Sequence, residues 1–495
     1  MTATHHSTQS HPATARREHW SGRLAFILAA SGSAVGLGNI WKFPYITGEN
    51  GGGWFVLIYL VCVVVVALPI MVAEILIGRS AQRSPVMALR KLAGPRSPWQ
   101  GVGWLGVAAA FVILSYYSVV AGWTLHYSWL ALSQGFAGMQ PTEVEALFGQ
   151  VHQDPGINLF WHGAFMLLTV AIVAAGVHGG VERSSRILMP LLFLMILALV
   201  LRAAGTDGFR PALTFVFGAH GDRLTPAGVL EALGHSFFTL SLGMGAMLTY
   251  GSYLRARDDA VATSLAVGGL DTLVSLMACM MIFPIIFAAG LAPGAGPGLV
   301  FISLPIAFGQ LPGGALWAAV FFVLLAVAAL TSAISLMEVA VSHFIDWRGW
   351  SRRRAAWGLG GLIFLLGIPS ALSGGIRLFG GDFAAATEVL FGAGQGKNWF
   401  DLFDYLASNW MLPLGGLGIA VFVAWRMGAQ AREHAFRAGS RFARLYWGWV
   451  WLLRYVVPVG VLAVFLHALG AVSYTHLRAH ETPEHLVCRL LLEKK

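Results

Sequence analysis

Two apolar segments of the chain contain glycines and hydroxyl side chains where a continuous membrane helix would be weakened. The first covers residues 31–39, with the sequence SGSAVGLGN, and the second covers residues 238–245, with the sequence FTLSLGMG. Glycine weakens a helix because it has high conformational entropy and no side chain to pack. In lipid, backbone without helical hydrogen bonds is tolerated only where it lines an enclosed site. Freed carbonyls and hydroxyls suit a hard cation, and freed amides suit a carboxylate, so the pair of breaks predicts a buried site for a solute and ions.

The composition predicts that these breaks lie within one integral membrane domain. The 495 residues are 57% hydrophobic and 11% charged, with a mean hydropathy of +0.69. A bilayer crossing needs about 20 apolar residues, and the chain has about 11 such stretches. We therefore expect an all-α integral membrane fold and no large soluble domain. The predicted crossings centre on residues 24–46, 52–77, 102–132, 159–177, 186–203, 228–253, 262–290, 314–345, 355–372, 402–426 and 446–470.

The two ends of the chain differ in character from this domain. Residues 1–19 are polar and are predicted to form a cytoplasmic N-terminal tail, and residues 20–471 form the transmembrane domain. Residues 472–495 are polar and rich in histidine, and they resemble a translated sequencing adaptor, although a genuine polar tail is the alternative. The first crossing is too long for a cleavable signal peptide and contains Asn39 and Lys42.

Basic residues are concentrated in alternate loops of this arrangement. The net charge is +9, and most arginines lie in the loops at 16–23, 79–96, 183–186, 255–257, 348–354 and 426–444. Since cytoplasmic loops carry an excess of Lys and Arg, this pattern places the N-terminus in the cytoplasm. Charge scattered over short loops argues against a nucleic-acid partner. The 3 cysteines do not form a pattern typical of a disulfide framework, and they give no evidence on the redox compartment.

Five motifs in order along the chain carry a resemblance to a known family. They are REHW at 17–20, AVGLGNIWKFP at 34–44, ENGGG at 49–53, FFTLSLG at 237–243 and LTS at 330–332. Over residues 17–470 the chain resembles the neurotransmitter:sodium symporter family, and in particular its bacterial amino-acid transporters. The resemblance implies an inverted repeat of spans 1–5 and 6–10 with spans 1 and 6 unwound. It also implies a multi-pass protein of the bacterial cytoplasmic membrane that uses the sodium gradient to import an amino acid by alternating access.

The resemblance implies two sodium sites, with Na⁺ as the co-transported ion and no organic cofactor. Both sets of ligands are oxygen atoms, as a hard cation prefers. Taken alone, Thr331-Ser332 would more simply be read as hydroxyls that bond to their own helix. The first implied set comprises the Ala34 carbonyl, Asn39, Thr239 and Asp271, and the second comprises the carbonyls of Gly32, Val35 and Ala328 with the hydroxyls of Thr331 and Ser332.

The substrate site implied by the resemblance has mostly apolar walls. It offers no charged residue to the substrate side chain, so we expect a neutral, hydrophobic or aromatic L-amino acid. Tyr117 would meet the substrate carboxylate, although a packed core aromatic is the alternative. The implied substrate-binding positions are Ala34, Gly36, Gly38, Ile113, Tyr117, Phe238, Thr239, Ser241, Met244, Ser332 and Leu336.

Asp271 stands where the family more commonly has asparagine. An acidic residue inside a membrane span is a functional candidate, although a satisfied structural acid is the alternative. The chloride-associated positions of the family correspond to Tyr59, His235, Asp271 and Ser275, and His235 replaces the usual glutamine. A fixed carboxylate would repel an anion, so we expect transport that does not depend on chloride.

The resemblance also implies two gates. The outer gate pairs Lys42 with Asp404, and lysine replaces the more common arginine, which makes a planar paired contact that lysine cannot make. The inner gate pairs Arg17 with Asp346, with Tyr253 nearby. Each pair could instead be ordinary solvated surface charge, which contributes little.

Residues 180–190, which begin with Gly180 and end with Pro190, match a family motif for helix unwinding in span 5. A loop-to-helix boundary explains the same pattern equally well.

Three other functions are weighed against sodium-coupled transport. An intramembrane enzyme would need a metal or nucleophile motif, and the sequence contains no HExxH, Walker or Rossmann pattern in context. A membrane sensor that binds an amino acid without transporting it, and a proton-coupled carrier on the same fold, remain the alternatives. The expected partners are a small amino acid and membrane lipid, with no nucleic acid and no obligatory protein partner.

Overall fold

The structure is a computed structural model that describes residues 18–133, 135–136, 138–218, 224–292 and 296–468. All regular elements in these ranges are helices. The predicted polar tail at 472–495 and most of the predicted N-terminal tail at 1–19 lie outside the described residues, so both domain boundaries stay predictions.

Two membrane crossings are broken, one in each half of the chain. Span 1 consists of α1 (Arg23–Ala34), an interruption at Val35 and Gly36, and then η1 (Gly38–Lys42) and α2 (Phe43–Glu49). Its two halves are bent by 57°. Span 6 consists of α11 (Pro226–Thr239), a turn over residues 240–245, and α12 (Ala246–Gly251). Both predicted interruptions are therefore confirmed at the positions where glycine and serine are concentrated.

The remaining crossings are continuous helices, several with short π-helical stretches. Among the described residues, 9 helices are long and apolar enough to cross a membrane, and the bent span 1 makes up to 10. Broken span 6 completes the prediction of about 11 crossings. The continuous spans are α3 (Gly53–Cys62) with η2 (Val63–Ala67) and α4 (Leu68–Ala81), α6 (Gln100–Ser133), α8 (Pro155–Ala174), η3 (Val177–Glu182) with α9 (Arg183–Ala204), α13 (Ala260–Ala288), α15 (Gly314–Arg348), α16 (Arg352–Leu372), α18 (Trp399–Tyr405) with η5 (Leu406–Met411), α19 (Leu412–Val421) and η6 (Phe422–Arg426), and η7 (Ala443–Leu445) with α21 (Tyr446–Trp451), η8 (Leu452–Val456) and α22 (Val457–Ala468).

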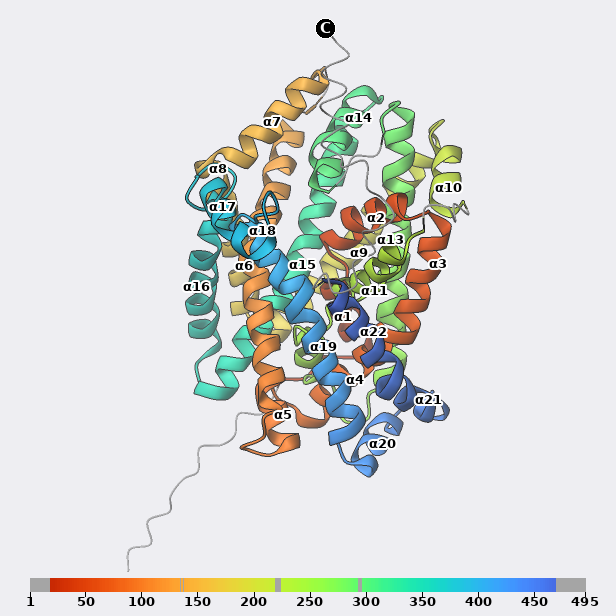
Figure 1. Ribbon diagram of the computed structural model, residues 1–495, viewed down its shortest axis with the longest axis vertical. Helices are drawn as coiled ribbons and strands as arrows, with labels where there is room; N and C mark the ends of the chain where they lie inside the picture. The colour runs from red at the N-terminus through yellow and green to blue at the C-terminus, as the bar shows by residue number, and fades with distance from the viewer. Residues whose placement is uncertain (1–17, 134, 137, 219–223, 293–295, 469–495) are drawn as a thin grey trace, which may run out of the picture.

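Short helices cover the two ends of this bundle. Toward the upper end in Figure 1 lie α7 (Pro141–Gln153), α10 (Phe209–Phe217) and α14 (Leu304–Gln310), which follows η4 (Leu299–Ser303). At the lower end lie α5 (Pro85–Ala93) and α20 (Ala429–Arg437), within two of the arginine-rich loops. The helix α17 (Gly381–Phe391) lies beside α18 in the upper half.

The outer helices show how the sequence separates lipid from core. On α9, Leu194, Leu197 and Leu201 are exposed, whereas Ile196 and Leu199 are fully buried. Exposed leucines at this helical spacing form a stripe that suits contact with lipid tails. The inner helices α6 and α15 are buried over most of their apolar length and form the centre of the bundle.

Span 5 is helical from Val177 onward. Gly180 lies within η3, and Pro190 lies inside α9. The segment between them is therefore wound in this conformation, and the helix boundary lies well before Pro190.

Candidate functional site

A cavity of about 30 Å³ lies between the two interruptions, near the middle of the bundle. All of the residues predicted to bind substrate line it. The structure adds Ser33, Leu37 and Asn39 to that lining. Ser33 and Leu37 were missed as lining residues, although they belong to the same Gly- and Ser-rich segment that marked the first break. The residues that line the cavity are Ser33, Ala34, Gly36, Leu37, Gly38, Asn39, Ile113, Tyr117, Phe238, Thr239, Ser241, Met244, Ser332 and Leu336.

The two interrupted segments contact each other directly. The Ser241 hydroxyl donates to the carbonyl oxygen of Ser33 at 2.8 Å, across 208 residues of sequence. Ser241 has a φ of 54°, in a region that residues other than glycine rarely adopt. This hydrogen bond satisfies a carbonyl that the break in span 1 leaves without a helical partner.

A cluster of oxygen atoms lies where α15 passes the first interruption. The Ser332 hydroxyl lies 3.4 Å from the Gly32 carbonyl oxygen and 3.2 Å from that of Val35. Thr331 donates its hydroxyl to the Ala328 carbonyl at 3.0 Å. A Cβ atom on Gly32 would lie 3.1 Å from Cβ of Thr331, so α1 and α15 pack closely here. The structure thus brings together all of the residues predicted for the second sodium.

A second polar cluster surrounds Asp271 on α13. The Asn39 side-chain amide donates to Thr239 Oγ1 at 2.8 Å and to Asp271 Oδ1 at 2.7 Å. The Thr239 hydroxyl donates to the same carboxylate oxygen at 3.0 Å. The side-chain oxygen of Asn39 accepts the N–H of Gly36 at 2.9 Å, within the interruption. Asn39, Thr239 and Asp271 are therefore in mutual contact, and Ala34 lines the adjoining cavity.

Of the other three chloride-associated positions, Tyr59 and Ser275 contact Asp271, and His235 lies beside Tyr59. The Tyr59 hydroxyl is 3.4 Å from Asp271 Oδ2, and the Ser275 hydroxyl donates to the Asp271 backbone carbonyl at 3.1 Å. The ring of His235 lies 5.8 Å from the ring of Tyr59. All four side chains are buried, so the carboxylate lies in a pocket of hydrogen-bond donors with little access to water.

A larger cavity of about 510 Å³ lies on the other side of Tyr117 and Phe238, which line both cavities. Lys42 and Asp404 both face this outer cavity. Lys42 Nζ lies 5.7 Å from the centre of the Phe238 ring, while Asp404 accepts from the hydroxyl of Tyr116 at 3.0 Å. The described part of the chain shows no ion pair between Lys42 and Asp404 in this conformation. Their predicted role as a gate stays a prediction.

The lower side of the central cavity is closed by packed side chains. Trp20 is 3% exposed, and its indole N–H donates to the Tyr250 carbonyl at 3.0 Å. The Tyr253 hydroxyl donates to Glu338, which also pairs with Arg352 at 2.7 Å. Arg352 was missed in the sequence because a basic residue at a helix start has no distinguishing spacing.

Of the predicted inner pair, only Asp346 falls within the described residues. It accepts the backbone N–H of Ser84 at 2.6 Å, and Arg83 Nη1 lies 3.7 Å from its carboxylate. Arg17 lies outside the described residues, so the Arg17–Asp346 pair stays a prediction. Arg83 was missed as a partner because it is one of many arginines in its loop.

Comparison with known proteins identifies the family. Residues 17–144 and 143–490 match the sodium:neurotransmitter symporter family. The chain belongs to this family. It is 39% identical over 456 residues to the sodium-dependent transporter YhdH of Bacillus subtilis, with 92% of this chain and 98% of that protein covered. It is 31% identical to the sodium-dependent transporter MJ1319 of Methanocaldococcus jannaschii, with 92% of each chain covered.

A solved structure supports the same conclusion for the fold. The crystal structure of MhsT in complex with L-phenylalanine matches with a TM-score of 0.82 and 43% sequence identity, covering 92% of this chain and 100% of that one. The predicted all-helical fold, with its broken spans 1 and 6, is confirmed. The symporter is thus a multi-pass membrane transporter that is coupled to sodium, and the family is one of transporters rather than enzymes.

Proposed function

We propose that this symporter imports a hydrophobic or aromatic L-amino acid together with sodium, by alternating access and without a need for chloride. We place it in a bacterial cytoplasmic membrane with its N-terminus in the cytoplasm. The observation that carries the proposal is the central cavity between the two interrupted helices, with an oxygen-rich cluster on each side. Uncompensated charge costs several kcal/mol at this depth in a membrane. The sodium ions and the zwitterionic amino acid therefore all need polar groups of the protein around them.

The polar end of the cavity suits an amino-acid backbone. The Tyr117 hydroxyl is buried and has no hydrogen-bond partner among the described residues, so it is free to donate to a carboxylate. The N-terminal end of η1 also faces the cavity through Leu37 and Gly38, and the positive end of a helix dipole favours a carboxylate. The substrate carboxylate would also contact the first sodium, which makes binding of the two interdependent.

The side-chain end of the cavity suits an apolar group. Ile113, Phe238, Met244 and Leu336 form its walls, and no charged residue of the described chain lines it. The cavity has room for about one water molecule as it stands, so the walls must move apart to admit an amino acid. Met244 can change conformation easily because its side chain is unbranched and flexible. L-Phenylalanine, the amino acid bound to the related MhsT, supports a large apolar substrate.

The clusters around Asp271 and Ser332 are our candidates for the first and second sodium sites. At the first, rotation of the Asn39 amide would turn its oxygen toward Thr239 and Asp271, where its N–H group now donates. At the second, the hydroxyls of Thr331 and Ser332 already face the carbonyls of the first interruption and of α15. Asp271 supplies a fixed negative charge that replaces a bound anion.

The driving force of such a transporter is large. Each elementary charge that crosses the membrane contributes about 2.3 kcal/mol per 100 mV, so two sodium ions contribute roughly 4.6 kcal/mol per 100 mV before their concentration gradient is counted. Coupling requires sodium to favour the state that is open to the outside and ready for substrate. The larger outer cavity and the closed lower side support an outward-facing conformation, in which the central cavity is still too small for an amino acid.

Uptake into proteoliposomes tests the proposal. Purified protein would be given an inward sodium gradient and a panel of labelled amino acids, with sodium and chloride replaced separately. We expect sodium-dependent uptake of hydrophobic or aromatic L-amino acids that persists when gluconate replaces chloride. Binding without uptake would favour a sensor, uptake driven by a proton gradient alone would favour a proton-coupled carrier, and either result would overturn the proposal.

A further inference from the structure

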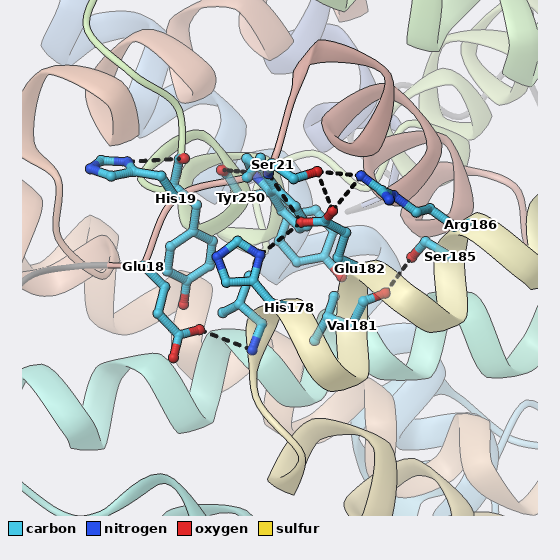
Figure 2. Close-up of polar contacts among 12 residues, drawn as sticks. Glu18, His19, Ser21, His178, Val181, Glu182, Ser185, Arg186 and Tyr250 are labelled. Atoms are coloured by element: carbon cyan, nitrogen blue, oxygen red, sulfur yellow. Dashed lines mark hydrogen bonds and ion pairs between the residues drawn. The ribbon is translucent and has the colours of Figure 1, made fainter.

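The residues that precede α1 are held by a polar cluster at the start of span 5. Figure 2 shows Ser21, His178 and Arg186 gathered around Glu182. The backbone N–H of Ser21 donates to Glu182 Oε2 at 3.2 Å, and its hydroxyl donates to the other carboxylate oxygen. Since 161 residues separate the two, this contact joins the cytoplasmic end of span 1 to that of span 5.

Glu182 is the centre of this cluster. Its side chain is 5% exposed, and it accepts from Arg186 Nη2 at 2.7 Å and from His178 Nδ1 at 3.1 Å. Arg186 also donates to the Ser21 hydroxyl. Ser21 is therefore hydrogen-bonded to two residues on one turn of span 5, Glu182 and Arg186. Both partners are ionised, and hydrogen bonds with an ionised partner are about twice as strong as neutral ones.

A second contact reinforces this connection. The carboxylate of Glu18 accepts the N–H of Val177 at 3.0 Å. Val177 is the first residue of η3, whose leading amides have no helical partners and favour negative charge. Residues 18 and 21 therefore bind the beginning and the end of the same short helical segment.

The same stretch of chain also covers span 6. Trp20 donates its backbone N–H to the Tyr253 carbonyl at 3.1 Å and its indole N–H to the Tyr250 carbonyl. Only Gly22 separates Ser21 from α1, and its backbone is extended. Because the linker is this short, α1 cannot move far from span 5 while Ser21 stays bound to Glu182.

We propose that Glu182, with Arg186 and Ser21, forms a latch that holds the cytoplasmic side closed by tying α1 to span 5. In the closed state α1 packs against α9, α13 and α15, and inward opening must separate it from at least one of them. The latch shifts the equilibrium between closed and inward-open states, so Glu182 is a positioning residue that contacts neither sodium nor substrate. This inference rests on the proposed alternating access.

Cysteine accessibility tests the latch without any transport measurement. The three native cysteines, Cys62, Cys279 and Cys488, would be replaced by alanine, and Ala25→Cys would be introduced on α1, where Ala25 is 2% exposed. The rate of reaction with a water-soluble maleimide then reports how often α1 moves away. We expect Glu182→Gln to raise this rate about tenfold, which corresponds to about 1.4 kcal/mol, and Ser21→Ala to raise it less.

A matched control uses another glutamate–arginine pair on the same side of the membrane. Glu433→Gln removes the partner of Arg437, at 2.8 Å on α20, which has the same i,i+4 spacing as Glu182 and Arg186. It should leave the labelling rate unchanged. If Glu182→Gln does not purify as a monodisperse protein, Ser21→Ala carries the test because Ser21 lies at the surface and its loss leaves the Glu182–Arg186 pair intact.

Transport provides a second readout. A weaker latch lowers the population of the closed state, so the sodium concentration for half-maximal uptake should rise several-fold in Glu182→Gln at equal amounts of folded protein. Labelling at the control rate in both Glu182→Gln and Ser21→Ala would overturn the latch. Failure of the proposed function would instead appear as absence of sodium-driven uptake in the unmodified protein, whatever the labelling rates.

Discussion

At the scale of single residues, Asp271 is the acidic residue at the centre of the proposed first sodium site. Its carboxylate accepts hydrogen bonds from Asn39 and Thr239 and lies near the hydroxyl of Tyr59. A carboxylate in such a buried position needs either these donors or a cation to offset its loss of water. A sodium ion beside it would therefore be attracted strongly in the low local dielectric.

Asp271→Asn should make transport depend on chloride. Loss of the fixed charge should raise the sodium concentration for half-maximal uptake at least about tenfold in gluconate, equivalent to about 1.4 kcal/mol. Added chloride should restore part of the affinity, because Tyr59 and Ser275 remain to bind an anion. Uptake measured with and without chloride checks this, and equal sodium dependence in both salts would contradict the assigned role of Asp271.

Thr331→Val should weaken the second sodium site while keeping the shape of the side chain. Thr331 Oγ1 lies near the carbonyls of Val327 and Ala328, so valine removes one oxygen without opening a cavity. We expect a loss of sodium affinity of about tenfold, measured by sodium-dependent substrate binding. Thr169→Val is a suitable control, because Thr169 is buried and bonds to its own helix on α8, away from both interruptions.

At the scale of elements, the interruption in span 6 is hydrogen-bonded to a buried acid of span 2. The backbone N–H of Gly243 donates to Glu74 Oε1 at 2.7 Å. Gly243 has a φ of 79°, and a Cβ atom there would lie 2.2 Å from the Leu412 carbonyl oxygen. Glycine is therefore required by both backbone conformation and the close approach of α19.

Gly243→Ala should destabilise the protein and abolish binding. The added methyl group has no space and the left-handed conformation costs about 1–2 kcal/mol, so we expect a clear fall in the melting temperature in detergent. Gly269→Ala on α13 is the matched control, since nothing lies within 4 Å of a Cβ atom there. Equal melting temperatures for the two variants would show that the turn at 240–245 adapts without cost.

The elements also show which features could be predicted from the sequence. The breaks were predictable because Gly36, Gly38 and Gly243 interrupt otherwise apolar segments of spanning length. The hydrogen bond between Glu74 and Gly243 could not be predicted, because an acid in span 2 could face any of several helices. Likewise, the sequence allowed the segment between Gly180 and Pro190 to be either helical or unwound. In this structure the segment is helical.

At the scale of the whole molecule, the cavities and the packed lower side describe a single state of the transport cycle. The outer cavity has a volume of about 510 Å³, whereas the lower side is closed around Trp20. Tyr117 and Phe238 separate the outer cavity from the small central one. In the proposed alternating-access cycle, this arrangement corresponds to an outward-facing state in which Tyr117 and Phe238 cover the central cavity.

Sodium and a transported amino acid should together stabilise the folded protein. A ligand that binds only the folded state at 100 times its dissociation constant adds about 2.7 kcal/mol to stability. We therefore expect a higher melting temperature in sodium than in potassium at equal ionic strength, with a further rise when the amino acid is added. Thr331→Val should show a smaller sodium effect, and equal melting in both salts would argue against specific sodium sites.

The sequence by itself determined the membrane class, the number of crossings to within the usual uncertainty, the two interruptions and the family. These features are local, because each depends on the composition or the motif of one short segment. Only the tertiary structure decided which oxygens face one another, as Ser332 meets Gly32 across 300 residues and Ser21 meets Glu182 across 161. It also showed that Lys42 and Asp404 face the same cavity without pairing. Contacts of this kind depend on how distant helices pack and on which state the transporter occupies, and no local pattern records either.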